Sequence, residues 1–194
     1  MPFMSENRFK VGIALAITTL ILYFFDVSNL LLGSALYTLF FYEQAILWRD
    51  IPSFYPIEFF TIIIYVILGI QAILHYNVCD KDQGIFLIGS VTISDILQYY
   101  AGRNIGRIKI GFPSPNKTIE GYVVGILLSI AIFWAVGYDA VVPILLGVLG
   151  DFFISIVKRR INVKDVSSLL GEHGGLLDRC DGIFMTVIMY HYLL

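Results

Sequence analysis

The sequence predicts an all-α, polytopic integral membrane protein, and three observations lead to this fold class. Of the 194 residues, 58% are hydrophobic and only 14% are charged, whereas a soluble domain carries about a quarter charged residues. Long apolar runs recur along the whole chain, each close to the roughly 20 residues that a helix needs to cross a bilayer. Most of the basic residues gather in two loops between these runs.

Seven transmembrane helices are predicted, in a single membrane domain over 1–194. The predicted spans are 11–25, 30–48, 57–76, 84–101, 119–137, 139–157 and 182–194. The first run follows a basic flank, as in a signal peptide, but we find no small-residue cleavage site after it and expect a retained span. Prolines interrupt the chain at 51–58, and a glycine turn separates the two runs that meet at 136–143.

The distribution of basic residues predicts how the helices are oriented. All 13 Lys and Arg residues except Lys81 fall on one side of this layout. Because cytoplasmic loops are enriched in Lys and Arg, we expect the amino terminus and the basic loops 99–121 and 155–181 in the cytoplasm. The carboxyl terminus is then expected outside. A net charge of −2 argues against a nucleic-acid partner, because such partners are bound chiefly through clustered positive charge.

The sixth predicted span carries a polar face. Gly147, Asp151, Ser155 and Lys158 are spaced by four, four and three residues, which places them on one side of a helix. An ionisable group inside a span is costly and usually faces a partner or an interior cavity. Asp95 occupies a similar place in the fourth span. These acids either pair with basic residues to fix helix packing or belong to a functional site; because each leads into a basic loop, we favour a site.

The loop before the last span combines glycines, carboxylates and cations. Its "GEHGG" segment surrounds Glu172 and His173 with glycines, which allow tight turns and close approach of a ligand. Asp178 and Asp181 follow, three residues apart. With Asp151 they suit Mg²⁺, which takes few carboxylates and completes its shell with water and substrate phosphates. Neighbouring cations suit a polyphosphate; they are Lys158, Arg159, Arg160, Lys164 and Arg179.

The other basic loop is of the same kind. Gly102 and Gly106 frame a basic turn, and "SPNKTIEG" brings Lys117 and Thr118 to the start of the fifth span. Ser114 or Thr118 also suits the cap of the helix that follows. Together the two loops predict a cationic, glycine-rich mouth over buried aspartates, and hence phosphate chemistry at the membrane surface.

These residues closely resemble the signature of the phosphatidate cytidylyltransferase family, the CDP-diacylglycerol synthases. The signature runs Ser, Lys-Arg, Lys-Asp, His-Gly-Gly and Asp-Arg-x-Asp. Here it reads Ser155, Lys158-Arg159, Lys164-Asp165, His173-Gly174-Gly175 and Asp178-Arg179-Cys180-Asp181, after Gly150-Asp151 and the upstream "SPNKTIEG". The resemblance covers 90–184, the predicted catalytic half. The chain departs from the family at Gly171-Glu172, where Pro-Gly is usual, and at Ile154, where Glu is common.

The resemblance implies a membrane nucleotidyltransferase of phospholipid biosynthesis, in a bacterial-type inner membrane. It would convert CTP and phosphatidate to CDP-diacylglycerol and pyrophosphate, with Mg²⁺ and room for a monovalent cation such as K⁺. The implied partners are the two substrates and membrane lipid, and a homodimer is left open.

The site residues are assigned in the same terms. The metal ligands are expected to be Asp151, Asp178 and Asp181. The other catalytic residues implied are Lys158, Arg159, Lys164, Asp165 and His173. Substrate contacts are implied for Ser155, Gly174, Gly175, Arg179, Lys117, Thr118, Arg103 and Lys109.

Three alternative functions stay open at this point. A lipid kinase would transfer the γ-phosphoryl group of a nucleotide such as CTP and release CDP, whereas a cytidylyltransferase releases pyrophosphate. A related transferase would act on another lipid phosphate. A transporter with a basic vestibule would use the buried acids for ion coupling, but we find no pair of interrupted helices that indicates inverted repeats.

Overall fold

The computed structural model is all-helical in the part of the chain that it describes, residues 29–50, 56–167, 169 and 174–193. Its helices are α2 (Asn29–Asp50), α3 (Pro56–Cys79), α4 (Lys81–Ile105), α5 (Ile119–Ala135), α6 (Val141–Arg160) and α7 (Leu177–Tyr192). The all-α class is therefore confirmed. Each helix covers most of one predicted span, from 30–48 to 182–194, while the predicted span 11–25 lies outside the described residues.

Several of these helices have the length and composition of membrane spans. Among the described residues, α3, α4 and α6 are long and apolar enough to cross a bilayer, and α5 is a shorter apolar helix. Large apolar side chains also lie on the outside, such as Leu127 and Trp134 at 61% and 80% exposed. Broad apolar surfaces are rare on soluble proteins, so these faces suit lipid. The total of seven spans stays a prediction.

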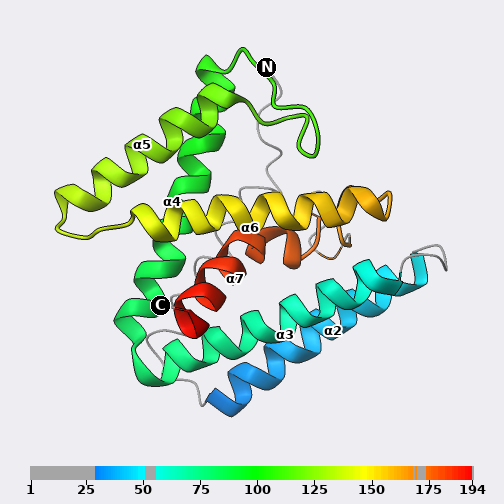
Figure 1. Ribbon diagram of the computed structural model, residues 1–194. Coiled ribbons are helices and arrows are strands. Elements are labelled where there is room, and N and C mark those ends of the chain that lie inside the picture. Colours follow the sequence, from blue (N-terminus) through cyan, green and yellow to red (C-terminus); the bar gives the residue numbers. More distant parts are fainter. Residues whose placement is uncertain (1–28, 51–55, 168, 170–173, 194) are drawn as a thin grey trace.

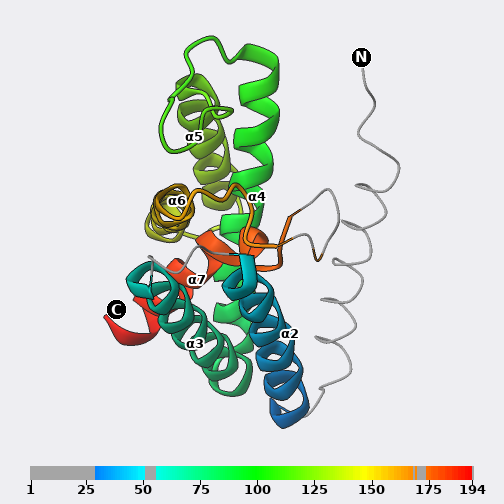
Figure 2. The same cartoon turned by 90° about the vertical axis from the view of Figure 1, so that its right-hand side faces the viewer.

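The helices pack as two pairs, α2 with α3 and α4 with α5, and α6 and α7 lie between these pairs. Helix α2 packs on α3, and α4 packs on α5, while α7 contacts α3, α4 and α6 (Figures 1 and 2). Phe40, Ile62, Ile154 and Phe184 from α2, α3, α6 and α7 are buried in one apolar cluster. The start of α7 is thereby held at the centre of the protein.

The segment between α4 and α5 folds into a small hairpin. The amide of Ile110 donates to the carbonyl of Lys117, and the amide of Ile119 donates to the carbonyl of Ile108, both at 3.0 Å. These two hydrogen bonds set the position of Lys117 at the edge of the hairpin next to α5.

The start of α5 is tied to this hairpin by side chains. Thr118 caps the helix, because its hydroxyl accepts a hydrogen bond from the amide of Gly121 at 3.2 Å. The carboxylate of Glu120 accepts the amides of Arg107 and Ile108 at 3.1 Å. Of the two cap candidates in the sequence, Thr118 is therefore the cap.

The contact between α4 and α5 depends on a glycine. A Cβ added at Gly125 would lie 2.5 Å from both the Cα and the amide nitrogen of Gln98. We expect Gly125→Ala to lower the free energy of unfolding by about 1–3 kcal/mol, since overpacking forces the backbones apart. Thermal unfolding in detergent would measure this effect. Gly89→Ala on α4 is the matched control, because a Cβ there meets nothing within 4 Å; equal losses in both variants would contradict the prediction.

Candidate functional site

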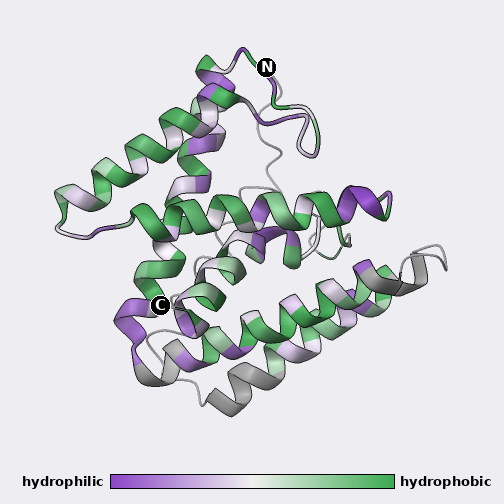
Figure 3. Ribbon diagram, in the orientation of Figure 1, coloured by the Kyte–Doolittle hydropathy of each residue, from purple (hydrophilic) through white to green (hydrophobic). Residues whose placement is uncertain are grey.

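The polar face of α6 points into the protein, as the spacing of its residues predicts. Gly147, Ser155 and Lys158 are buried, and Asp151 is half-buried. Figure 3 shows apolar residues along most of α6 and polar residues gathered at its carboxyl end and at the facing start of α7. The polar face thus lies where α6, α7 and the hairpin before α5 meet.

The first polar contact on this face is an ion pair between Lys117 and Asp151. The Lys117 ammonium donates to Oδ2 of Asp151, and the hydroxyl of Tyr122 donates to the same oxygen at 3.2 Å. The ammonium also lies 5.2 Å from the centre of the Tyr122 ring, within the range of a cation–π contact. Burial by itself would lower the pKa of Lys117, but the Asp151 carboxylate raises that pKa overall. Lys117 therefore keeps its positive charge.

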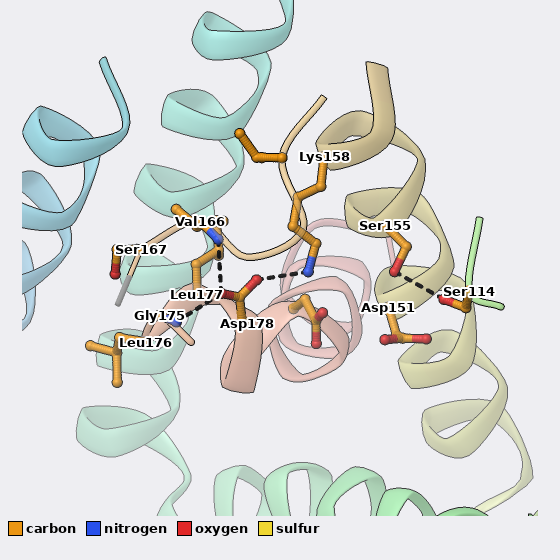
Figure 4. Close-up of polar contacts among 12 residues, drawn as sticks. Ser114, Asp151, Ser155, Lys158, Val166, Ser167, Gly175, Leu176, Leu177 and Asp178 are labelled. Atoms are coloured by element: carbon orange, nitrogen blue, oxygen red, sulfur yellow. Dashed lines mark hydrogen bonds and ion pairs between the residues drawn. The ribbon is translucent and has the colours of Figure 1, made fainter. Parts of the chain in front are cut away.

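The second contact is an ion pair between Lys158 and Asp178. Lys158 Nζ lies 2.7 Å from Asp178 Oδ1, and the two side chains are only 9% and 6% exposed. The other oxygen, Oδ2, accepts the backbone amides of Val166 at 2.9 Å and Gly175 at 2.8 Å (Figure 4). Both oxygens of Asp178 are in use, so this carboxylate also holds the loop before α7.

Ser155 lies on α6 between the two ion pairs. The hydroxyl of Ser114 in the hairpin lies 3.4 Å from the hydroxyl of Ser155 (Figure 4). This contact, together with Lys117 and Asp151, holds the hairpin against α6. The hairpin loop and the loop before α7 are therefore brought together along one helix, as the sequence predicts.

Asp181 adds a third carboxylate at the same place. It is 5% exposed, its Oδ1 accepts the amide of Gly182 at 2.8 Å, and its backbone carbonyl accepts the hydroxyl of Tyr65. Its charge interacts with those of Asp151 and Asp95 and with Lys158. Carboxylates from α4, α6 and α7 are thus close enough to repel one another.

The carboxylates of this site are of the kind that bind a divalent cation. Among the described residues, no three acidic, His or Cys side chains stand close enough to form a ready-made metal cage. Mg²⁺ needs no such cage, because it is held by one or two carboxylates plus water and substrate phosphates. Of the two carboxylate oxygens of Asp151, only Oδ2 accepts hydrogen bonds from the described residues. Oδ1 of Asp151 and Oδ2 of Asp181 take part in none of these hydrogen bonds, and carboxylate oxygens are the kind of ligand that suits Mg²⁺.

The remaining basic residues of the predicted site lie outside the two ion pairs. Arg159 donates to the carbonyls of Pro113 and Val163, both at 3.0 Å, so it ties the hairpin to the end of α6. Charged side chains that the structure places in exposed positions are Arg103, Lys109, Lys164, Asp165 and Arg179. The exposed groups are accessible to a soluble ligand.

The glycines of the loop before α7 lie in tight surroundings. Gly174 has φ +78°, which favours glycine. A Cβ added at Gly175 would overlap Oε1 of Glu43. Gly175 therefore admits a carboxylate of α2 and carries a clear packing role, besides the substrate contact predicted from the sequence. His173, the remaining predicted residue of this loop, lies outside the described residues.

Two residues of this region were not assigned to the site from the sequence. Glu43 was visible as an acid inside a predicted span, which is a signal of an interior role, but its partners lie far away in the sequence. Tyr122 follows Thr118 by four residues, one helical turn, and nothing in the sequence distinguishes it from the other aromatic residues of the chain.

The chain was compared with known proteins. It matches the model of the cytidylyltransferase family over residues 3–194. It is 36% identical over 121 residues to a phosphatidate cytidylyltransferase of Aquifex aeolicus, and these residues make up 57% of this chain and 46% of the relative. It is 30% identical over 158 residues to that of Helicobacter pylori strain J99 (74% and 55% covered). For that of Staphylococcus aureus strain COL, the values are 38% over 124 residues (56% and 46%).

These matches establish the family. The chain spans about half the length of the curated relatives it matches. The family model, in contrast, covers nearly the whole chain, including the site described above. The chain therefore belongs to the cytidylyltransferase family.

Proposed function

We propose that the protein is a phosphatidate cytidylyltransferase, which makes CDP-diacylglycerol and pyrophosphate from CTP and phosphatidate. The observation that carries this proposal is the pair of lysine–aspartate contacts on one face of α6, Lys117–Asp151 and Lys158–Asp178. They gather cations and carboxylates from two separate loops, as binding of a polyphosphate with a divalent cation requires. The relatives named above carry the same activity in their names.

In the proposed reaction, an oxygen of the phosphatidate phosphate attacks the α-phosphorus of CTP. A new oxygen–phosphorus bond forms, the bond from the α-phosphorus to the bridging oxygen breaks, and its electron pair leaves with pyrophosphate. A phosphate monoester has its second pKa at about 6, so the nucleophile is already anionic and needs no strong base. The barrier is mainly charge repulsion and positioning.

Lys117 and Lys158 are placed to lower that barrier. Each ammonium is held by a carboxylate in a half-buried or buried position, where a charge acts more strongly on a ligand than it does in water. When phosphate oxygens arrive, each lysine can share its three donors between its aspartate and the ligand. Exposed cations such as Arg103 and Lys109 would then attract the lipid phosphate or the nucleotide.

Mg²⁺ is part of this proposal. Asp151 and Asp181 would hold it, and Asp178 could join them if Lys158 left its Oδ1. Bound Mg²⁺ would neutralise phosphate oxygens of the nucleotide. The proposed second ion, a monovalent cation such as K⁺, follows from the sequence resemblance alone.

The proposed setting is a bacterial inner membrane, with seven spans and both site loops in the cytoplasm. The concentration of basic residues on one side of the predicted layout supports this orientation. CTP would reach the site from the cytoplasm, and phosphatidate would reach it from the bilayer.

A single assay tests the proposal. Purified protein in detergent–lipid micelles would receive phosphatidate and CTP labelled at the α-phosphorus, with Mg²⁺ or with a chelator. We expect labelled lipid and an equal amount of pyrophosphate with Mg²⁺, and neither product after chelation. Labelled CDP without labelled lipid would instead indicate a kinase, and no turnover would contradict the proposal.

A further inference from the structure

Glu43 is a fully buried carboxylate in the middle of α2, at 0% exposed. It accepts three hydrogen bonds from the loop before α7 and from the first residue of that helix, more than 120 residues away in the sequence. Oε1 accepts the hydroxyl of Ser167 at 2.8 Å and the amide of Leu176 at 2.6 Å, and Oε2 accepts the amide of Leu177 at 2.9 Å. The acid of α2 is therefore bound to both ends of this loop.

These contacts provide the cap that α7 lacks in its own sequence. Helix α7 begins after Leu176, whose side chain cannot accept a hydrogen bond. The first amides of a helix need acceptors, and a carboxylate is also favoured there by the helix dipole. Glu43 satisfies the amides of Leu176 and Leu177, so the start of α7 is placed by a residue of α2.

Glu43 and Asp178 each bind both ends of the loop, through residues that are neighbours in the sequence. At the first end, Asp178 accepts the amide of Val166 and Glu43 accepts the hydroxyl of Ser167. At the second end, Asp178 accepts the amide of Gly175, and Glu43 accepts the two amides that follow. The described ends of the loop are thus held together by two carboxylates. One of them, Asp178, also forms the ion pair with Lys158.

The packing around Gly175 shows how closely the parts fit. A Cβ at this position would overlap Oε1 of Glu43 and would lie 2.9 Å from the hydroxyl of Ser167. The loop backbone therefore rests directly on the Glu43 carboxylate, and a shift of that carboxylate must move the residues just before Asp178.

We infer that Glu43 is a positioning residue of the proposed reaction, which sets the places of Asp178 and Lys158 through the start of α7. This inference rests on the proposed function, because it takes the Lys158–Asp178 pair as part of the reacting site. It also connects α2, outside the segment that carries the sequence signature, to the chemistry of the carboxyl-terminal half.

Glu43→Gln tests the inference while it keeps the size of the side chain. The new amide group must point a donor at another donor, so at least one of the three hydrogen bonds is lost. We expect faster hydrogen–deuterium exchange in the peptide that contains Leu176 and Leu177. We also expect kcat to fall on the order of 100-fold with little change in the two KM values, since a shift of about 1 Å at charged reacting groups has that effect.

Gln44→Leu is the matched control, because Gln44 is the next residue of α2 and is equally buried. Neither polar atom of its side chain has a hydrogen-bond partner in the described part of the chain. This variant should leave amide exchange at α7 and kcat unchanged. Glu43→Asp keeps the carboxylate and should recover part of the kcat that Glu43→Gln loses, which a loss of bulk packing alone would not explain.

Ser167→Ala provides a second test if Glu43→Gln does not fold. It removes a single neutral donor and should lower kcat about 2- to 10-fold, with no further loss when it is added to Glu43→Gln. The inference would be overturned if a folded Glu43→Gln variant showed wild-type exchange and kinetics. If that variant does not fold, the same result in Ser167→Ala would overturn it. If the wild-type protein makes no CDP-diacylglycerol, the proposed function fails. The exchange measurement then decides by itself whether Glu43 places the start of α7.

Discussion

Replacing Lys158 with methionine is expected to lower the free energy of unfolding by about 3–5 kcal/mol. The two side chains of the Lys158–Asp178 pair are 9% and 6% exposed, so the variant leaves the Asp178 carboxylate buried beside two amides without its counter-ion. For a chain of this size, the loss corresponds to a drop of about 6–20 °C in the midpoint of thermal unfolding. The measurement is thermal unfolding of the purified protein in detergent.

Two further variants separate the loss of the pair from a general loss of charge. Asp178→Asn added to Lys158→Met removes the uncompensated charge, so the double variant should be more stable than Lys158→Met alone. Arg160→Met removes a basic residue that is exposed at the end of the same helix and should change the midpoint little. An unchanged midpoint in Lys158→Met would show that this buried pair does not contribute to stability.

Asp151→Asn is expected to reduce kcat by about 10²–10³-fold, the usual effect of removing one electrostatic group from an active site. Asparagine keeps an oxygen that can accept from Lys117 and Tyr122, so the fold should persist. It removes the charge that holds Lys117 and that would bind Mg²⁺. The measurement is kcat and KM for CTP over a range of Mg²⁺ concentrations, with the thermal midpoint as a check on folding.

Asp139→Asn is the matched control for this experiment. Asp139 is exposed in the turn between α5 and α6, at the far end of the helix that carries Asp151. The control should keep the wild-type kcat. Near-normal turnover of Asp151→Asn at limiting Mg²⁺ would contradict the assignment of Asp151 as a metal ligand.

Much of the candidate site was predictable because its residues lie on one regular element. The period of an α-helix is known from covalent geometry, so the spacing of Asp151, Ser155 and Lys158 was enough to place them on one buried face of α6. The basic loops next to these residues were likewise visible as interruptions of apolar runs. The sequence could also predict that the hairpin loop and the loop before α7 meet, because each follows a span that carries an aspartate, Asp95 or Asp151.

The choice of partners was not predictable in the same way. Nothing in the sequence indicates that Lys117 pairs with Asp151 and Lys158 with Asp178, since the chain also carries Asp95 and Asp181 in the same region. The turn of the hairpin and the crossing of α6 over α7 decide this. Asp178 also uses both of its oxygens on Lys158 and on two backbone amides, an arrangement that the expected role of metal ligand does not include.

By itself, the sequence determined an all-helical protein with apolar helices, the buried polar face of α6 and the family. These properties follow from local periodicity, hydropathy and short motifs. Only the tertiary structure decided that Glu43 of α2 caps α7, that Gly175 leaves room for its carboxylate, and that Tyr122 joins Lys117 at Asp151. Such contacts join residues that are far apart in the chain, and the packing of the helices alone brings their atoms within hydrogen-bonding distance.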